Sequence, residues 1–216
     1  MATEDFFRIQ IEKTALLVID MQRGFLDKGS VMEVPQGREI IPNIRQLVEA
    51  GRKRGVSVIF TQFVYSPKVP NLIGELHPEH KPMPLGGRPG FRKPSNCCLE
   101  GDSSTEVVAD LAPMENEPVV QKHGYDAFFA TDLDPTLRSR GVQTLVVTGV
   151  MTDICVLATV NSAVHREYRV LVVRDAVATL WPEVQQITLD LIERAYGRVV
   201  STTEILKQMA EAPGLC

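Results

Sequence analysis

The sequence predicts an α/β protein in which helices cover both faces of a single parallel β-sheet. Most of its apolar runs are continuous rather than alternating, which is typical of strands that are buried on both faces. Segments with helical periodicity lie between these runs, and several of them end at a glycine. An alternating order of strands and helices favours a parallel sheet with right-handed crossovers.

Six apolar runs are expected to form the strands of this sheet. In chain order they are Thr14–Asp20, Val56–Gln62, Pro118–Lys122, Gln143–Gly149, Arg169–Arg174 and Arg198–Ser201. Three segments between them are expected to be helices, and each is followed directly by a glycine that can end a helix. These helices are Glu39–Arg54, Leu133–Arg140 and Glu183–Tyr196.

A fourth helix is expected over Asp153–Arg166. Its apolar residues cover a sector wider than the roughly 100° stripe that packing against one sheet face requires. The remaining apolar surface indicates contact with other copies of the chain, so we expect a homodimer or a homotetramer.

Length and charge limit the classes of function. At roughly 150 residues per domain, a chain of 216 residues predicts a single domain over 1–216. Its 23 basic and 27 acidic residues give a net charge of −4, which offers no attraction for nucleic acid or for an anionic membrane surface.

The sequence also carries predictions about the compartment. The first residues, MATEDFFRIQ, place acids where a secretory signal requires a basic region and an apolar stretch. No apolar run approaches the roughly 20 residues of a membrane helix. The four cysteines, Cys97, Cys98, Cys155 and Cys216, form neither a C-x-x-C zinc pair nor a disulfide framework. We therefore expect a cytoplasmic protein with at least one free thiol.

Residues 63–104 interrupt the alternation of strands and helices. The stretch contains seven prolines and shows no clear periodicity. Long irregular segments inside compact domains are often lids or binding loops, and otherwise surface insertions. We expect a lid-like irregular insertion here, and the sequence leaves both interpretations open.

Three polar side chains follow three of the predicted strands. Asp20 ends the first strand, Lys122 ends the third, and Cys155 follows the fourth within one helical turn. Ligands of open parallel sheets bind beyond the carboxyl ends of the strands, so we expect these side chains to meet there. Taken singly, each has an ordinary interpretation, as a capping carboxylate, a solvated lysine or a cysteine that fills the core.

The surroundings of Cys155 favour a catalytic thiol over a structural one. In the segment TDIC (152–155), Thr152 or Asp153 can act as the N-cap, so the thiol falls in the first turn of a helix. The helix dipole and the unpaired N–H groups of that turn stabilise a thiolate, so we expect a lowered pKa for Cys155. Helical spacing also places Cys155 on the more polar face of the helix.

Three blocks of the sequence resemble the cysteine-hydrolase, or isochorismatase-like, superfamily. They are LLVIDMQ (16–22), QKHGYDAFFATDLDPTLRSRG (121–141) and VVTGVMTDICVLAT (146–159). The resemblance runs in matching order from about Thr14 to Ile205. It implies a three-layer α/β/α fold, the Rossmann-like isochorismatase-like hydrolase fold, with a six-stranded parallel sheet of order 3-2-1-4-5-6.

The resemblance also implies a site, carried over by position. It implies a catalytic triad of Asp20, Lys122 and Cys155, and a cis peptide bond between Val150 and Met151. The backbone N–H groups of Met151 and Cys155 would form the oxyanion hole. In the implied amidohydrolase reaction on a small-molecule substrate, Asp20 is the general base, Lys122 holds the anions, and the thiolate attacks an amide-type carbonyl.

Two departures from the patterns of the superfamily narrow the choice of reaction. Isochorismatases proper hydrolyse a vinyl ether and carry no cysteine at the position of Cys155. Nicotinamidases carry a metal-binding Asp-x-His after the Thr-Gln that ends the second strand, whereas Phe63 and Tyr65 occupy those two positions here. Neither aromatic side chain offers a ligand that zinc prefers.

We therefore expect no metal and no cofactor. His77 and His80, in the segment HPEH, have a spacing that could suit a metal, but in a proline-rich loop we expect them to be solvated. The expected reaction is the hydrolysis of a C–N bond in a small amide, ureido or carbamoyl compound, with the particular substrate left open.

A candidate substrate pocket surrounds the implied triad, and its residues are Gln22, Phe25, Tyr65, Tyr125 and Phe128. At least one of Phe128 and Phe129 is expected to belong to the core instead. Arg23, Arg88 and Arg92 are candidates for binding a substrate carboxylate, without a preference among them.

Other classes of function stay open. An isochorismatase-type vinyl-ether hydrolase and a nicotinamidase are the enzymatic alternatives, and a small-molecule binding module on the same scaffold is the non-enzymatic one. A dinucleotide enzyme would need a G-x-G-x-x-G turn after the first strand, which residues 20–24 do not supply.

Overall fold

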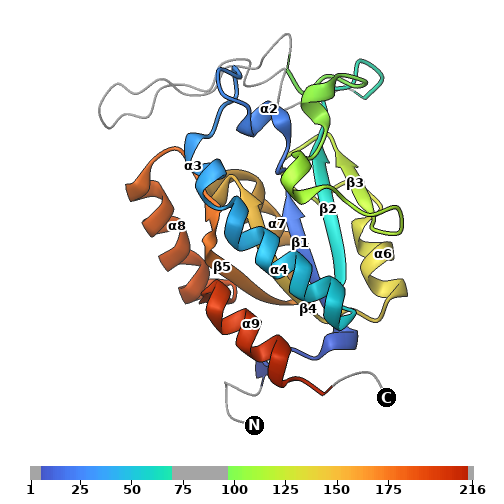
Figure 1. The fold of residues 1–216 in the computed structure, drawn as a ribbon, viewed down its shortest axis with the longest axis vertical. Coiled ribbons are helices and arrows are strands. Elements are labelled where there is room, and N and C mark those ends of the chain that lie inside the picture. Colours follow the sequence, from blue (N-terminus) through green and yellow to red (C-terminus); the bar gives the residue numbers. More distant parts are fainter. Residues whose placement is uncertain (1–5, 70–96, 214–216) are drawn as a thin grey trace.

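A six-stranded parallel β-sheet forms the centre of the molecule, and helices cover both of its faces (Figure 1). The computed structural model describes residues 6–69 and 97–213. The strands are β1 (Thr14–Ile19), β2 (Ser57–Phe63), β3 (Val119–Lys122), β4 (Thr144–Val150), β5 (Arg169–Ala178) and β6 (Arg198–Val200). Their order across the sheet is β3-β2-β1-β4-β5-β6, which confirms the predicted fold class and topology. β1 and β4 are therefore neighbours at the point where the strand order reverses.

The alternation of side chains along β1 supplies both hydrophobic cores. Leu16 and Val18 pack on one face with α4 (Ile41–Arg54) and α9 (Thr202–Glu211). Leu17 and Ile19 pack on the other face with α6 (Leu133–Ser139), α7 (Leu157–Val164) and α8 (Pro182–Ala195). Because β1 is covered on both faces, all six of its residues are buried. Each Leu or Ile side chain removed from water stabilises the fold by about 1.5–3 kcal/mol.

The helix predicted over Glu39–Arg54 divides in two. Its first residue belongs to α3 (Pro35–Glu39), and α4 begins only at Ile41, with a proline at its second position. Proline is tolerated there because the first N–H groups of a helix have no partner within it. The predicted end is confirmed, since Gly55 adopts a left-handed conformation with φ +82° and donates its N–H to the last turn.

The largest difference between a predicted and an observed strand boundary is at the end of β5. The expected strand stopped at Arg174, where the apolar run meets charge, but β5 continues to Ala178. Asp175 does not end the strand because its carboxylate accepts the N–H of Thr202, at 2.8 Å, and so supports the start of α9. The helix α9 is absent from the predicted helices, although residues Ser201–Glu204 carry a capping box, which is typical of a helix start.

The helix after β4 begins differently from the prediction. A π-helical turn over Thr152–Val156 precedes α7, and its N-cap is Met151, so the prediction of Thr152 or Asp153 as N-cap is wrong. The carboxylate of Asp153 instead accepts a hydrogen bond from the hydroxyl of Thr179, at 2.5 Å. This bond ties the turn to the end of β5.

The irregular stretch is described only at its two ends. Phe63 belongs to β2, and Tyr65 forms an isolated parallel bridge with Leu99. The lid-like body of the predicted insertion, residues 70–96, lies outside the described residues. Short helical segments complete the described fold: α2 (Arg23–Leu26) and turns at Ile11–Lys13, Ser103–Thr105 and Ala109–Leu111.

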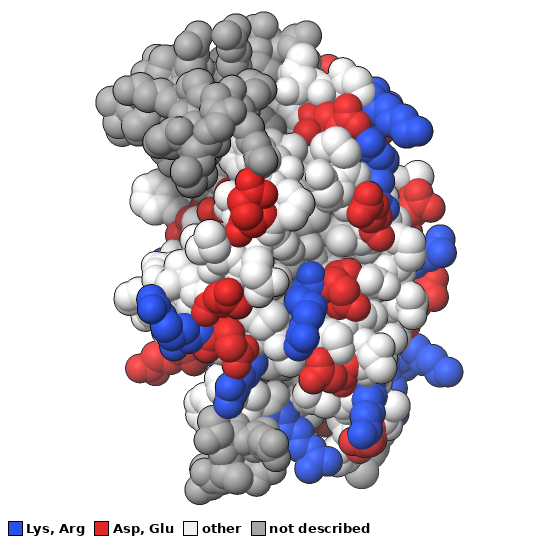
Figure 2. Space-filling model, turned by 90° about the vertical axis from the view of Figure 1, so that its left-hand side faces the viewer, with Lys and Arg blue, Asp and Glu red and all other residues white. Residues whose placement is uncertain are grey.

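The charged surface shows no field of one sign on the face drawn in Figure 2, where basic and acidic side chains are interspersed. Within the described parts of the chain, no helix is long and apolar enough to cross a membrane.

Candidate active site

Lys122 lies at the centre of a buried polar cluster. It is the last residue of β3, and its side chain crosses the end of β2 to reach β1 and the turn after β4. Its ammonium group forms an ion pair with Asp20 Oδ2 at 2.7 Å and donates to the carbonyl oxygen of Gly124 at 3.0 Å and to Cys155 Sγ at 3.4 Å. The ring of Phe63 lies below the ammonium group, with 5.0 Å between Nζ and the ring centroid.

Asp20 is held by the neighbouring strand. The hydroxyl of Thr61 donates to Asp20 Oδ1 at 2.6 Å and accepts the backbone N–H of Asp20 at 3.1 Å. Asp20 itself has φ +51°, a left-handed conformation that is uncommon for residues other than glycine. The carboxylate is fully buried, with one oxygen facing Thr61 and the other facing Lys122. The three predicted residues, Asp20, Lys122 and Cys155, therefore meet in space.

The Cys155 thiol does not titrate as the sequence predicted. Burial raises its pKa to about 12, with Lys122 acting to lower the value and Asp20 acting to raise it. The helix start stabilises a thiolate less than expected because the side chain is almost completely buried, at 6% exposed, and packs within the core beneath α7. The prediction of a lowered pKa is therefore wrong, and the prediction of a polar helix face around the thiol fails for the same reason.

The Lys122 ammonium group keeps its charge in this environment. Burial by itself lowers the pKa of Lys122, but the Asp20 carboxylate and the Cys155 sulfur outweigh burial, and the pKa lies above its ordinary value. At neutral pH the cluster thus holds an ammonium group and a protonated thiol beside the Asp20 side chain.

The backbone between the end of β4 and Cys155 forms a tight turn that includes a cis peptide bond. The peptide bond between Val150 and Met151 is cis. The carbonyl of Met151 accepts the N–H groups of Ile154, at 3.1 Å, and Val156, at 3.0 Å. Met151 and Cys155, the residues expected to form the oxyanion hole, thus belong to one turn.

Gln22 has a structural task rather than a place on the pocket wall. Its amide nitrogen donates to the carbonyls of Phe63, at 3.0 Å, and Thr105, at 3.1 Å, while its amide oxygen accepts the N–H of Phe63 at 2.7 Å. The side chain is fully buried. With its hydrogen-bonding groups engaged, Gln22 joins the ends of β1 and β2 to the loop before β3.

The predicted aromatic wall divides into core and pocket residues. Phe25 is buried in the core behind Phe63, and Phe128 is buried and stacked on Tyr168, so both are corrected to core residues. Tyr65 and Tyr125 remain beside the cluster. Burial, and then Cys155, raise the pKa of Tyr125 to about 12. Burial also raises the pKa of Tyr65, and the nearby Tyr125 acts in the same direction.

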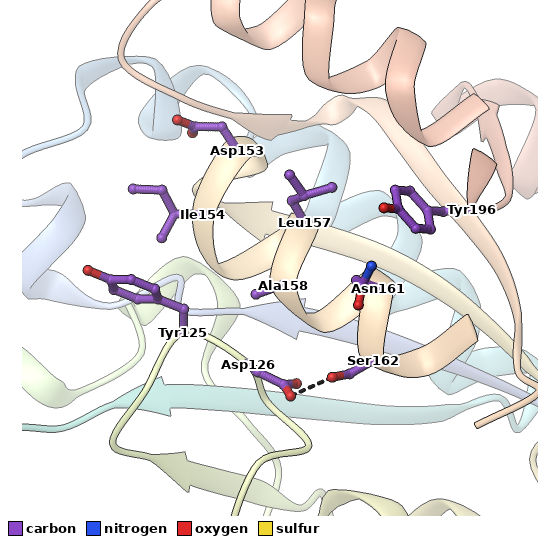
Figure 3. A pocket seen from close by; sticks show the side chains of 9 residues that line it. All are labelled: Tyr125, Asp126, Asp153, Ile154, Leu157, Ala158, Asn161, Ser162 and Tyr196. Atoms are coloured by element: carbon purple, nitrogen blue, oxygen red, sulfur yellow. Dashed lines mark hydrogen bonds between the residues drawn. The ribbon is translucent and has the colours of Figure 1, made fainter. Parts of the chain in front are cut away.

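A groove of about 680 Å³ runs from Tyr125 along α7 (Figure 3). Its lining residues come from the loop after β3, the π-helical turn, α7 and the residue after α8, and they include Ile154, Leu157 and Tyr196. Ile154 directly precedes Cys155, so the groove begins next to the buried cluster. Asp126 and Ser162 also line the groove, and a hydrogen bond joins their side chains.

Of the predicted arginines and the two histidines with a possible metal spacing, only Arg23 lies within the described residues. Arg23 is exposed and paired with Asp27, at 3.1 Å, which leaves it no role at the cluster. Arg88, Arg92, His77 and His80 lie outside the described residues. Among the described residues, no group of three His, Cys, Asp or Glu side chains could hold a metal ion.

Sequence reasoning missed Thr61 and Phe63 as parts of the cluster. Both lie on β2, and their relation to Asp20 and Lys122 follows from pairing across the sheet, which places Phe63 opposite Lys122. The available signal was their position at the carboxyl end of a strand next to β1.

The fold and the cluster together define a class: a doubly wound α/β protein with a buried thiol, carboxylate and ammonium group beyond its central strands. The family model "Isochorismatase domain" matches residues 14–204. The chain belongs to the isochorismatase family, within the cysteine hydrolase superfamily.

Individual relatives are similar over most of the chain. It is 32% identical over 219 residues to the ureidoacrylate amidohydrolase RutB of Stutzerimonas stutzeri, which covers 95% of this chain and 86% of the relative. The structure of a cysteine hydrolase from Pseudomonas syringae pv. phaseolicola matches with a TM-score of 0.81 and 28% identity over 95% of this chain and 96% of the other. An N-carbamoylsarcosine amidase from Thermoplasma acidophilum matches with a TM-score of 0.71 and 29% identity over 88% and 96%.

Proposed function

We propose that this chain is an amidohydrolase that cleaves a C–N bond of a small amide, ureido or carbamoyl compound through a covalent acyl-enzyme on Cys155. The observation that carries the proposal is the contact of one ammonium group with a carboxylate at 2.7 Å and a thiol sulfur at 3.4 Å, all buried. The similar proteins named above act on ureido and carbamoyl compounds by their names, which favours that substrate class.

The raised pKa of Cys155 determines the first step. Because the thiol is protonated at neutral pH, it needs a base when the substrate carbonyl arrives. Asp20 takes the thiol proton, and the sulfur attacks the carbonyl carbon. Lys122 stays charged beside the carboxyl group and the sulfur, so it stabilises the negative charge that moves between them.

The remaining steps reuse the same groups. The N–H groups of Met151 and Cys155 stabilise the tetrahedral oxyanion, and the protonated Asp20 gives its proton to the leaving nitrogen. The C–N bond breaks and leaves a thioester or thiocarbamate on Cys155. A water molecule, deprotonated by Asp20, then attacks that carbonyl and releases the product acid and the thiol.

The test is a comparison of ammonia release from a panel of linear amides, ureido acids, carbamoyl compounds and nicotinamide. We expect turnover with ureido or carbamoyl compounds, none in the Cys155→Ala variant, and an acyl adduct on Cys155 by mass spectrometry after acid quench. Binding without turnover across the panel would instead support a binding module. Cleavage of a vinyl ether in the Cys155→Ala variant would support the isochorismatase-type reaction.

A chelator distinguishes the proposal from a metal-dependent nicotinamidase. Phe63 and Tyr65 occupy the two ligand positions, and Phe63 instead supplies its ring to Lys122. We expect activity to survive EDTA. Activity that is lost and then restored by zinc or manganese contradicts this assignment.

We also propose that the chain forms a homodimer or homotetramer in a reducing cytoplasm. Ile154, Leu157 and Ala158 give the groove along α7 an apolar side, and the cysteines of the described chain are free thiols. Light scattering that shows only a 24.0 kDa species at micromolar concentration contradicts the oligomer.

A further inference from the structure

Two cysteines that the proposed reaction does not use lie next to each other in the sequence and in space. Cys97 and Cys98 are 3% and 0% exposed, and their sulfur atoms are 3.9 Å apart. Both are free thiols. Sulfur atoms at this distance are in van der Waals contact without a bond between them.

Both sulfur atoms pack against Gly24 at the start of α2. Cys97 Sγ lies 3.6 Å from the hydroxyl of Ser30 and 3.6 Å from the carbonyl oxygen of Gly24. A side chain at Gly24 would collide with both sulfurs, because a Cβ there would lie 2.5 Å from Cys98 Sγ and 2.9 Å from Cys97 Sγ. Because Gly24, in α2, has no side chain, there is space for the two thiols to meet.

The two thiols titrate differently. Hydrogen bonding with Cys98, together with Ser30 and Ser104, lowers the pKa of Cys97 to about 6 against the opposing effect of burial. The same contact and burial raise the pKa of Cys98 far above its ordinary value. A thiolate is the form of a cysteine that attacks an oxidant, and the contact between the two sulfurs favours that form at Cys97.

We propose that Cys97 and Cys98 form a reversible modification site, at which a two-electron oxidant such as hydrogen peroxide joins them in a vicinal disulfide. The Cys97 thiolate attacks one peroxide oxygen, the O–O bond breaks, and Cys97 becomes a sulfenic acid, while the leaving hydroxide takes a proton from solvent and becomes water. Cys98 then attacks the sulfenic sulfur, the S–S bond forms, and a second water leaves. Overall, the two cysteines lose two electrons, and one hydrogen peroxide accepts them and is reduced to two waters.

Reversibility follows from the covalent geometry. Adjacent Cα atoms are about 3.8 Å apart across a trans peptide, whereas disulfides usually join Cα atoms that are roughly 4.4–6.8 Å apart. A disulfide between neighbours is therefore strained, and strained disulfides are readily reduced. A small thiol such as dithiothreitol is expected to restore both thiols.

The pair is connected to the candidate active site through Cys98. Its carbonyl accepts the N–H of Tyr65 at 2.7 Å, and its sulfur lies 4.0 Å from the amide of Gln22, which fixes the backbone of Phe63. Closing the S–S bond to about 2.05 Å moves the Cys98 sulfur away from that position. We expect oxidation to displace Tyr65, which lies near Tyr125 and Cys155, and so to raise KM, a consequence that rests on the proposed function.

The primary test does not depend on activity. The parent chain and the Cys155→Ala variant are treated with hydrogen peroxide, denatured, alkylated and digested, and the peptide with both cysteines is weighed. We expect this peptide to lose two hydrogens and to resist alkylation in both proteins, and dithiothreitol to reverse both changes. Sulfinic acid on Cys97 with Cys98 still alkylated, or a disulfide from either residue to Cys155 or Cys216, overturns the proposal.

The coupling to the pocket is tested separately, on the substrate that the ammonia-release panel identifies. We expect the KM of the oxidised chain to rise and to return after reduction, and the Cys97→Ser variant to keep its KM under the same treatment. A KM that does not change while the disulfide forms overturns the coupling alone. Disulfide formation in a chain without turnover leaves the modification site intact and contradicts only the amidohydrolase.

Discussion

The chain buries two sulfur sites to nearly the same extent, and their thiols titrate in opposite directions. Cys155, 6% exposed, has its pKa raised to about 12, whereas Cys97, 3% exposed, has its pKa lowered to about 6. Burial raises the pKa in both places, so burial alone cannot set the reactivity of a thiol. Burial is the largest cause at Cys155, where Lys122 acts to lower the pKa and Asp20 acts to raise it. At Cys97, hydrogen bonding with Cys98, Ser30 and Ser104 outweighs burial.

This contrast separates two ways of using a thiol. Burial keeps the sulfur of Cys155 protonated until a substrate arrives, and the neighbouring carboxylate of Asp20 can then remove the proton. Hydrogen bonding at Cys97 instead favours the thiolate, the form of a cysteine that reacts with an oxidant.

Loss of the Cys155 sulfur has the largest expected effect. Cys155→Ala removes the nucleophile, so we expect no detectable turnover, with an unchanged circular dichroism spectrum because a small side chain is tolerated in that turn. Cys97→Ser is the matched control, since it replaces an equally buried sulfur, and it should keep most of the activity under reducing conditions. Equal losses in the two variants, or appreciable activity in Cys155→Ala, would remove the distinction between the sites.

Asp20→Asn is expected to lower kcat by about 10²- to 10⁴-fold, the usual contribution of a general base. The amide keeps the shape of the side chain and can still accept the Thr61 hydroxyl, but it cannot take the thiol proton. Single-turnover kinetics should show both acylation and deacylation slowed, because Asp20 moves protons in both. An effect on acylation alone contradicts the assignment of one base to both steps.

Thr61→Val tests whether the Asp20 carboxylate must be held in place. A hydrogen bond to a charged group contributes about 1.5–3 kcal/mol, so we expect kcat/KM to fall on the order of ten- to a hundredfold. The hydroxyl donates to Asp20 Oδ1 at 2.6 Å, so its loss frees the carboxyl group to leave its position beside Lys122.

Two matched variants make the Thr61 experiment specific. Thr61→Ser should recover most of the activity, because it restores the hydroxyl. Thr148→Val removes another buried hydroxyl, which donates to the carbonyl of Leu17 at 2.9 Å on the neighbouring strand and does not contact Asp20. If Thr148→Val lowers kcat/KM as Thr61→Val does, the effect is one of general packing.

The comparison also shows what the sequence could and could not predict. Asp20, Lys122 and Cys155 were found from their places after three strands, because a parallel sheet brings all carboxyl ends to one edge. Thr61 and Phe63 were missed, since their contacts depend on the register between β1, β2 and β3, which the predicted strand order does not give. The direction of the Cys155 pKa was wrong because a local rule about helix starts ignores how deeply the core covers the turn.

Core and pocket aromatics were hard to separate for a similar reason. Phe25 and Phe128 stand close in sequence to site residues, yet their rings pack against Phe63 and Tyr168 in the core. Position along the chain places a residue near the site, while the direction of its side chain depends on packing from elements distant in sequence. Gln22 shows the same limit, because its partners Phe63 and Thr105 lie far along the chain.

The smallest expected effects are changes in the alkylation rate of Cys155, measured with iodoacetamide at fixed pH. Below the pKa of a thiol, its rate follows the thiolate fraction, so one unit of pKa changes the rate about tenfold. Lys122 lowers the pKa of Cys155 and Asp20 raises it. Lys122→Met should therefore slow alkylation of Cys155, and Asp20→Asn should speed it.

Cys97 provides an internal reference in the same sample. Its pKa of about 6 depends on Cys98, Ser30 and Ser104, none of which either substitution alters. We expect the alkylation rate of Cys97 to rise through pH 6 and to be the same in the parent and in both variants. Lys122→Met leaves a buried carboxylate unpaired, at a cost of roughly 3–5 kcal/mol, so its fold must be verified before its rates are compared. Shifts of Cys155 in the same direction in both variants, with Cys97 unchanged, would show that packing rather than the opposed charges of Asp20 and Lys122 sets the state of the thiol.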